Sequence, residues 1–162
     1  MFNIGDRVVY PMHGAGFIEG IVLQTVGGQQ KEYYDIRIHG GSIRLKLPVQ
    51  NVGAIRLREV MDQTKAQQVL EYFKGLEVDL SAPWGKRYKE NMDRLKTGVP
   101  EEVAEVVKTL MLRDKAVGLS TGDRQVMVLA RNILCSELSL ALDMEIEDLQ
   151  KELQNVIEEM IG

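Results

Sequence analysis

The residues whose types and spacing are best suited to chemistry lie in one short segment, residues 83–89, with the sequence PWGKRYK. Trp84, the only tryptophan of the chain, stands there beside Lys86, Arg87 and Lys89. Basic side chains hold DNA phosphates, and an inserted apolar side chain can unstack base pairs from the minor groove. An aromatic ring that stacks on an unstacked base contributes about 1–3 kcal/mol. The pattern therefore predicts a segment that contacts melting DNA, with Trp84 as an apolar wedge.

The same segment allows a second interpretation of Trp84. Helical spacing places Trp84, Tyr88, Met92 and Leu95 in one apolar row. In this interpretation the indole packs in the core of a helical domain and does not contact DNA. The pattern alone leaves both interpretations open.

No catalytic or metal site is indicated elsewhere in the chain. Cys135 lies in an apolar helical stretch and is expected to be a small buried hydrophobe. His13 and His39 belong to the other half of the chain, so a Cys–His couple is not expected. One cysteine and two histidines give no zinc spacing, and there is no P-loop or GxGxxG motif. We expect no enzymatic activity, no metal, no cofactor and no small-molecule substrate.

Two rival functions stay open on the residues alone. In the first, the protein is a peptide-binding adaptor that docks a partner with its β structure and has no DNA role. In the second, it is a small hydrolase that uses Cys135 or His13 as its reactive group. A buried, unreactive thiol would argue against the hydrolase, because the thiolate is the nucleophile.

Short strands are expected to build the N-terminal part of the chain. Strand-like runs cover 7–10, 16–23, 33–38 and 43–47, and glycine- or proline-rich turns separate them. In the last run Ile43, Leu45 and Leu47 alternate with Arg44 and Lys46, so we expect the two basic side chains on the exposed face. Four or five short strands in under 60 residues predict a small barrel of Tudor or SH3 type.

From Asp62 onward the apolar residues follow a helical period. Five helices are predicted: from Asp62 to Gly75, from Ser81 to about Lys96, from Pro100 to Gly118, from Ser120 to Ala141, and from Ile146 to Met160. The stripe of the last helix is expected to be Ile146, Leu149, Leu153, Val156 and Met160. We therefore predict an α+β protein, with a Tudor/SH3-like β domain at residues 1–58 and a compact all-α domain at residues 59–162.

The charge of the chain is unevenly distributed. The net charge is −4, but residues 1–58 and residues 84–96 each carry a net +3, whereas residues 143–160 carry −6. DNA affinity should therefore be modest and salt-sensitive, because few phosphates can be neutralised. The N-terminus does not resemble a signal peptide, and no unbroken apolar run approaches the ~18 residues of a membrane span. We expect a cytoplasmic protein without membrane contact.

The chain resembles the CarD family, also called CdnL, of bacterial transcription regulators, over essentially its whole length. The resemblance is carried by GDRVVYPMHGAG at 5–16, QKEYY at 30–34, WGKRYKEN at 84–91, VAEVV at 103–107 and RNIL at 131–134. The first of these motifs is shared with the polymerase-interacting module of transcription-repair coupling factor. Its combination with the tryptophan motif is specific to the family.

The resemblance implies a division of labour between the two domains. The Tudor-like domain would bind the β subunit of bacterial RNA polymerase, and the helical domain would lie over promoter DNA near the −10 region. Trp84 would wedge into the minor groove at the edge of the transcription bubble and stabilise the open complex. Lys86, Arg87 and Lys89 match the basic DNA-contacting cluster. The protein would then be found at the nucleoid, through RNA polymerase.

Two positions depart from the family pattern on the polymerase-binding side. Lys46 falls where the family carries an arginine, and Gln24 falls where it carries a second one. Lysine lacks the bidentate fork of arginine, so we expect a weaker or differently shaped contact at Lys46. At Gln24, either the partner surface has adapted to the loss of the arginine charge or the partner binds more weakly there. Arg44 is the third candidate polymerase contact.

Overall fold

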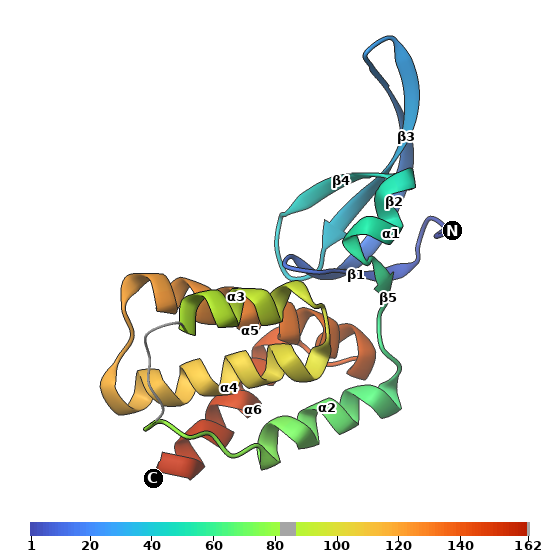
Figure 1. Ribbon diagram of the computed structural model, residues 1–162. Coiled ribbons are helices and arrows are strands. Elements are labelled where there is room, and N and C mark those ends of the chain that lie inside the picture. The colour runs from blue at the N-terminus through green and yellow to red at the C-terminus, as the bar shows by residue number, and fades with distance from the viewer. Residues whose placement is uncertain (82–86, 162) are drawn as a thin grey trace.

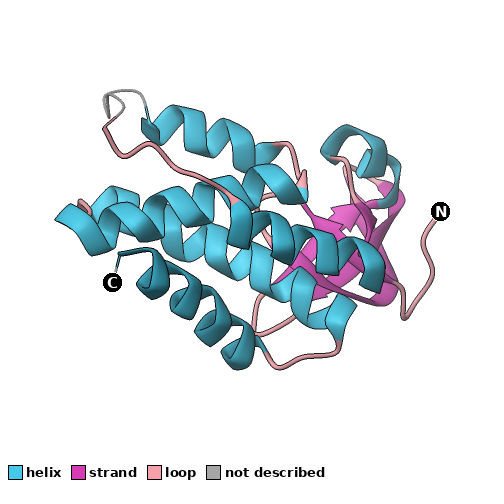
Figure 2. Cartoon of the chain, turned by 90° about the horizontal axis from the view of Figure 1, so that it is seen from below, coloured by secondary structure: helices cyan, strands magenta, loops and turns pink. Residues whose placement is uncertain are grey.

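The computed structural model describes residues 1–81 and 87–161. A β-sheet with one long projecting hairpin stands on a bundle of helices, and the two parts follow each other along the chain (Figure 1). Figure 2 shows the strands gathered at one end of the helical bundle. The predicted α+β class, with a Tudor-like domain before an all-α domain, is confirmed.

Five antiparallel strands form the sheet, in the spatial order β4-β3-β2-β1-β5. The strands are β1 (Arg7–Tyr10), β2 (Gly14–Val26), β3 (Gln29–Ile38), β4 (Arg44–Pro48) and β5 (Arg58–Glu59). Between β4 and β5 lie a short 3-10 helix η1 (Val49–Asn51) and one turn of helix α1 (Val52–Ile55). Ile18, Tyr34, Ile36 and Leu47 fill the core of the sheet. The two-residue strand β5 is too short to give an alternation signal, which is why the sequence did not predict it.

The hairpin of β2 and β3 is longer than the sequence predicted. It turns at Gly27 and Gly28, both with positive φ (59° and 80°), which is the backbone that a tight two-residue hairpin turn requires. Its outer half is rich in glutamine, so alternation does not reveal it. Ile43 was predicted to face inward, but it precedes β4 and is 54% exposed.

The helical domain consists of α2 (Gln63–Gly75), α3 (Arg87–Lys96), α4 (Pro100–Val117), α5 (Thr121–Leu142) and α6 (Ile146–Ile161). The predicted N-cap Ser120 is confirmed, and Asp62 is an N-cap that the sequence analysis did not name. Asp62 accepts a hydrogen bond from the Lys65 amide (2.8 Å), and Ser120 accepts one from the Asp123 amide (3.1 Å). These bonds satisfy free N–H groups at the helix ends and fix where α2 and α5 begin.

Two helix predictions need correction. In α6 the buried residues are Leu149, Leu153 and Ile157, whereas Met160 is 47% exposed. Spacings of four keep residues on one face over two turns, so Ile157 takes the inward position that was assigned to Met160, whereas Val156 is partly buried and packs against the same core as predicted. The described part of α3 begins at Arg87, and Ser81 lies in a turn where its hydroxyl donates to Asp79 (2.6 Å). Pro83, predicted in the first turn of that helix, lies outside the described residues.

Helix α5 is the central element of the helical domain. Among the described helices it alone is long and apolar enough, by length and composition, to cross a membrane. However, it packs against α2, α4, α6 and strand β2, and 61% of its apolar window is buried inside the protein. Its apolar character is therefore accounted for by the core.

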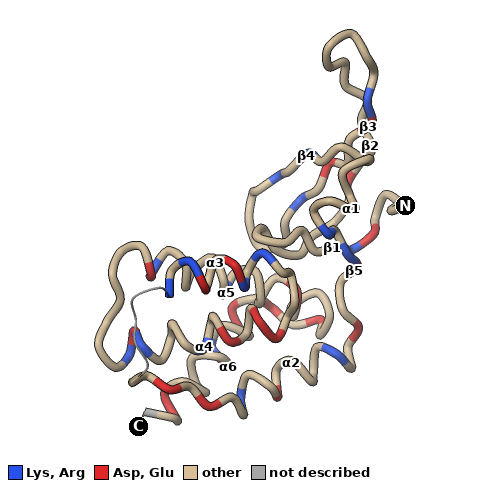
Figure 3. The backbone as a smooth tube through the Cα atoms, in the orientation of Figure 1, with Lys and Arg blue, Asp and Glu red and all other residues tan. Residues whose placement is uncertain are grey.

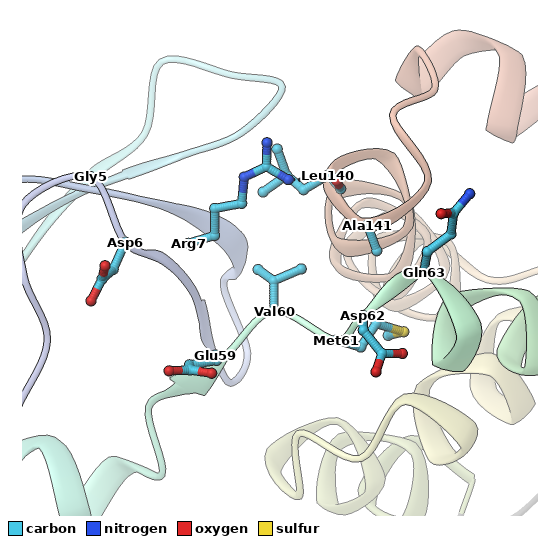
Figure 4. Close-up of a pocket in the computed structure, with 10 residues that line it drawn as sticks. All are labelled: Gly5, Asp6, Arg7, Glu59, Val60, Met61, Asp62, Gln63, Leu140 and Ala141. Atoms are coloured by element: carbon cyan, nitrogen blue, oxygen red, sulfur yellow. Dashed lines mark hydrogen bonds between the residues drawn. The ribbon is translucent and has the colours of Figure 1, made fainter.

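One face of α5 forms the junction with the sheet. Gly14 approaches this face so closely that a Cβ atom there would lie 2.9 Å from the Ser136 hydroxyl. The Ala15 amide donates to that hydroxyl (2.9 Å), and Arg7 donates to the Leu140 carbonyl (2.7 Å). Figure 4 shows Arg7 and Leu140 in the open pocket at this junction, beside Val60.

The centre of the junction is an ion pair between the half-buried side chain of Arg58 and the buried carboxylate of Glu137. Both guanidinium NH₂ groups donate to the carboxylate, each at 2.7 Å, and Glu137 is only 4% exposed. The carboxylate also accepts the Met61 amide (2.9 Å), and Arg58 donates to the Gly98 carbonyl (3.0 Å) just after α3. A bidentate pair with further hydrogen bonds fixes orientation as well as distance. The sheet, the connecting segment, α3 and α5 therefore meet at one pair of side chains.

We expect Glu137→Ala to lower the free energy of unfolding by about 3 kcal/mol, because it leaves the Arg58 guanidinium without its carboxylate. Asp93→Ala removes one member of the exposed Lys89–Asp93 pair. This control should cost at most about 1 kcal/mol. Urea denaturation of the full chain measures both values. Equal losses would show that the junction pair adds nothing to stability.

Candidate functional site

The three candidate polymerase contacts lie on one face of the sheet. In an antiparallel ladder, residues directly opposite each other point to the same side. Gln24 is opposite Lys31 on β3, and Lys46 and Arg44 on β4 are opposite Asp35 and Arg37. Because Lys31, Asp35 and Arg37 are odd-numbered neighbours along β3, all these side chains share one face. We call this the outer sheet face; its members are Val22, Gln24, Lys31, Tyr33, Asp35, Arg37, Arg44, Lys46 and Pro48.

The two basic residues of β4 differ in their surroundings. Arg44 contacts Glu19 at 2.8 Å and Asp35 at 3.6 Å, and Arg37 contacts Glu19 at 2.9 Å. The hydrogen bond from Arg37, assisted by the nearby Arg44, lowers the pKa of Glu19. Lys46 is exposed, and no ion pair holds it within residues 1–81 and 87–161. Lys46 is therefore an exposed cation of this face that a partner carboxylate can reach without displacing Glu19.

Glu19 was not identified from the sequence. It stands at an irregularity of the β2–β3 pairing between Ile18 and Gly20, where the register shifts. A bulge re-aims the side chain of the extra residue. This places Glu19 where it can pair with both Arg37 and Arg44. Gly20 was the only signal in the sequence that could have suggested a bulge.

The candidate DNA-contacting residues lie at or before the start of α3. Trp84 and Lys86 lie outside the described residues. Arg87 is the first residue of α3, and Lys89 is exposed and pairs with Asp93 one turn later at 3.3 Å. This pair is formed by two exposed side chains and is therefore weak. Lys89 remains accessible to a DNA phosphate.

Helix α3 buries only part of the predicted apolar row. Leu95 is fully buried and Met92 is half-buried, but Tyr88 is 56% exposed. Asn91, which was not predicted as a core residue, is buried instead. The residues of this row therefore become more exposed toward the N-terminal end of α3, where Arg87 and Lys89 lie.

An acidic loop lies next to the start of α3. Asp79 lies beside Arg87, and both line a hollow of about 260 Å³ with Arg94 and Glu105. Hydrogen bonds from Ser81 are the main reason that the pKa of Asp79 lies below its ordinary value, and the charge of Arg87 adds to this effect. The basic residues of α3 are visible along that helix in Figure 3.

The residues of the rival hydrolase interpretation are not arranged for catalysis. Cys135 is fully buried, and burial raises the pKa of its thiol to about 12. A thiol in this state is not a nucleophile at neutral pH. His39 Nε2 is hydrogen-bonded to the Ser139 hydroxyl (2.9 Å) at the domain junction, and His13 packs edge-on against Tyr10. No group of three potential metal ligands occurs in the described part of the chain.

The junction residues Arg58 and Glu137 were also missed by the sequence analysis. Glu137 interrupts the apolar stretch of α5, and a charged residue on a buried helix face usually has a partner. That signal was available, but it could not identify Arg58, which lies 79 residues earlier in the chain.

Comparison with known proteins covers nearly the whole chain. Residues 2–61 match the CarD-like/TRCF RID domain, and residues 68–154 match the C-terminal domain of CarD. RID domains of this class interact with RNA polymerase. The chain is also 36% identical over 140 residues to YdeB of Bacillus subtilis (strain 168), a protein whose name proposes that it is a transcription factor. That alignment spans 86% of this chain and 92% of YdeB. The two domain matches and this relative show that the protein belongs to the CarD family of transcription regulators.

Proposed function

We propose that the protein docks on the β subunit of bacterial RNA polymerase and stabilises the open complex at promoters. The proposed polymerase contacts are Lys46, Arg44 and Gln24 on the outer sheet face. The proposed DNA contacts, near the upstream edge of the −10 region, are Trp84 as a minor-groove wedge and Lys86, Arg87 and Lys89 as phosphate ligands. The protein would act in the cytoplasm, at the nucleoid, wherever polymerase is bound to promoters.

One observation supports this proposal most strongly. Lys46, Arg44 and Gln24 share one face of the sheet, and the Arg58–Glu137 pair joins that sheet to the end of α3. A partner bound at the outer sheet face would therefore carry α3 to a defined position. A protein that only displayed a peptide-binding sheet would not need this connection.

Docking on polymerase would compensate for the low DNA affinity of the weakly charged segment at residues 84–96. Residues 84–96 carry a net charge of only +3 within a chain of net charge −4, so free DNA affinity should be low. Tethering to a polymerase already at the promoter raises the effective concentration of this element at one place. The location on DNA would then come from the polymerase and not from base readout, because no helix carries the Arg/Asn/Gln pattern of a major-groove reader.

The effect on promoters is a shift in a reversible equilibrium. A factor that binds only melted DNA favours the open complex by its difference in affinity for the two states. If stacking of Trp84 and a few phosphate contacts supply about 1–3 kcal/mol, the open-to-closed ratio rises roughly 5- to 150-fold.

We expect Lys46→Glu to weaken binding of RNA polymerase at least tenfold, because an exposed cation of the outer sheet face becomes an anion that also lies opposite Asp35. Lys151→Glu, an identical charge reversal on the exposed side of α6, is the control and should bind like the wild type. Biolayer interferometry with purified core polymerase measures both. Unchanged binding of Lys46→Glu would place the docking surface elsewhere.

We expect Trp84→Ala to leave polymerase binding intact and to remove most of the gain in open complex, whereas Trp84→Phe should retain part of it through its ring. Promoter-melting fluorescence with polymerase holoenzyme measures the open fraction. If Trp84→Ala promotes melting as strongly as the wild type, the wedge is wrong. If the wild type binds polymerase but never changes melting, the protein is a docking adaptor without a DNA role.

A further inference from the structure

The side of the helical domain carries a hollow lined by cationic and apolar side chains. Its volume is about 290 Å³, and three helices, α4, α5 and α6, contribute to it. Lys115 and Asp114 come from α4, Arg124, Met127 and Arg131 from α5, and Gln154 from α6. Arg124, Met127 and Arg131 recur at intervals of three and four, so they share one face of α5. Neither the sheet nor α3 takes part in this hollow.

Arg131 stands out among these residues. Its Nε–H group is buried and has no hydrogen-bond acceptor in the described part of the chain. Nor does any ion pair within residues 1–81 and 87–161 involve its guanidinium. Buried donors in folded proteins nearly always have a partner, so an orphan requires an explanation such as a bound ion or ligand. Arg131 also opens the RNIL motif, which neither the polymerase contact nor the DNA contact uses.

The remaining charges of the hollow favour an anion. The one carboxylate that lines it, Asp114, is held by Arg124 at 2.8 Å. Lys115 lies 3.9 Å from Glu158 of α6, and both side chains are about half exposed, so this pair is weak. The charge of Lys115 is therefore only weakly compensated, and the Nε–H group of Arg131 has no acceptor among the described residues. A guanidinium fork matches the oxygens of a phosphoryl group, and a lysine adds a second point charge.

We propose that this hollow binds a small phosphorylated molecule, with Arg131 and Lys115 as its phosphate ligands. Its volume lies near the lower end of the range for small-molecule sites. The Gln154 amide offers a further polar contact, and Met127 offers an apolar wall for the rest of the ligand. Promoter DNA is not the proposed ligand, because α3 and α6 lie on opposite sides of α4 (Figure 1) and the hollow is lined in part by α6.

The test uses the full chain labelled with ¹⁵N, so that the Nε–H signal of Arg131 is observed directly. Titration with inorganic phosphate and with pyrophosphate should shift this signal saturably, whereas sodium chloride of the same ionic strength should not. Arg131→Gln should weaken pyrophosphate binding at least tenfold, as measured by calorimetry. Arg44→Gln removes the same charge from the outer sheet face and is the matched control, which should bind pyrophosphate like the wild type.

Three outcomes would overturn the proposal. The first is no response of the Arg131 signal to either phosphate compound. The second is equal loss of binding in Arg131→Gln and Arg44→Gln, which would show a general effect of charge. The third is a response to a short DNA duplex but not to pyrophosphate, which would make the hollow a DNA-backbone contact. If Arg131→Gln does not fold, Lys115→Gln provides the same comparison at an exposed position.

Discussion

The ion pair between Arg58 and Glu137 connects the sheet to α5 and to the end of α3. If the outer sheet face and α3 act together, this pair keeps the two surfaces at a fixed distance and orientation. Arg58 lies in β5, the edge strand of the sheet, and Glu137 lies in the central helix α5. The Arg58 guanidinium also donates to the Gly98 carbonyl, which follows α3. Each of these groups would be costly to bury alone, so the pair tolerates little displacement. The close approach of Gly14 to Ser136 completes the contact on the backbone side. Without this junction, the outer sheet face and α3 would belong to two domains joined only by the chain.

A rigid junction matters for affinity as well as for shape. A flexible linker would spread the DNA-contacting segment over a large volume. A rigid junction would keep that segment at one position relative to a polymerase-bound promoter. This advantage suits a DNA element with little net charge, because most of the binding free energy can then come from the protein partner. The acidic C-terminal helix reinforces the same arrangement, since residues 143–160 carry a net charge of −6 and would repel an extended DNA backbone, whereas the small hollow at the edge of this helix is lined by Lys115, Arg124 and Arg131. The proposed DNA contact would thereby be confined to the side of the bundle on which α3 lies.

Charge pairing also distinguishes residues that look alike in the sequence. Arg44 and Lys46 alternate on one strand, but a bulge directs Glu19 to Arg44 and leaves Lys46 accessible. In the helical domain, Arg124 is neutralised by Asp114, whereas the Nε–H group of Arg131, two turns further along the same face of α5, has no partner among the described residues. An unpaired cation keeps its full attraction for an external anion, and a paired one must first give up its partner. The candidate sites are therefore set by which charges the fold leaves unmatched.

The sequence by itself determined the elements. Alternation predicted the exposed side of β4, and the helical period of the apolar residues from Asp62 onward predicted α2, whose buried residues are Ala66, Val69, Leu70 and Phe73. The capping residues Asp62 and Ser120 and the glycine turn at 27–28 are local signals, because the bonds they make or the φ angles they need lie within a few residues. The family motifs likewise identified the candidate site residues.

Only the tertiary structure decided how these elements meet. It pairs Arg58 with Glu137, and Glu19 with Arg37 and Arg44. It also exposes Tyr88 and leaves the Nε–H group of Arg131 without an acceptor among the described residues. These contacts join residues far apart in the chain, and no local period encodes which distant charge a side chain will meet.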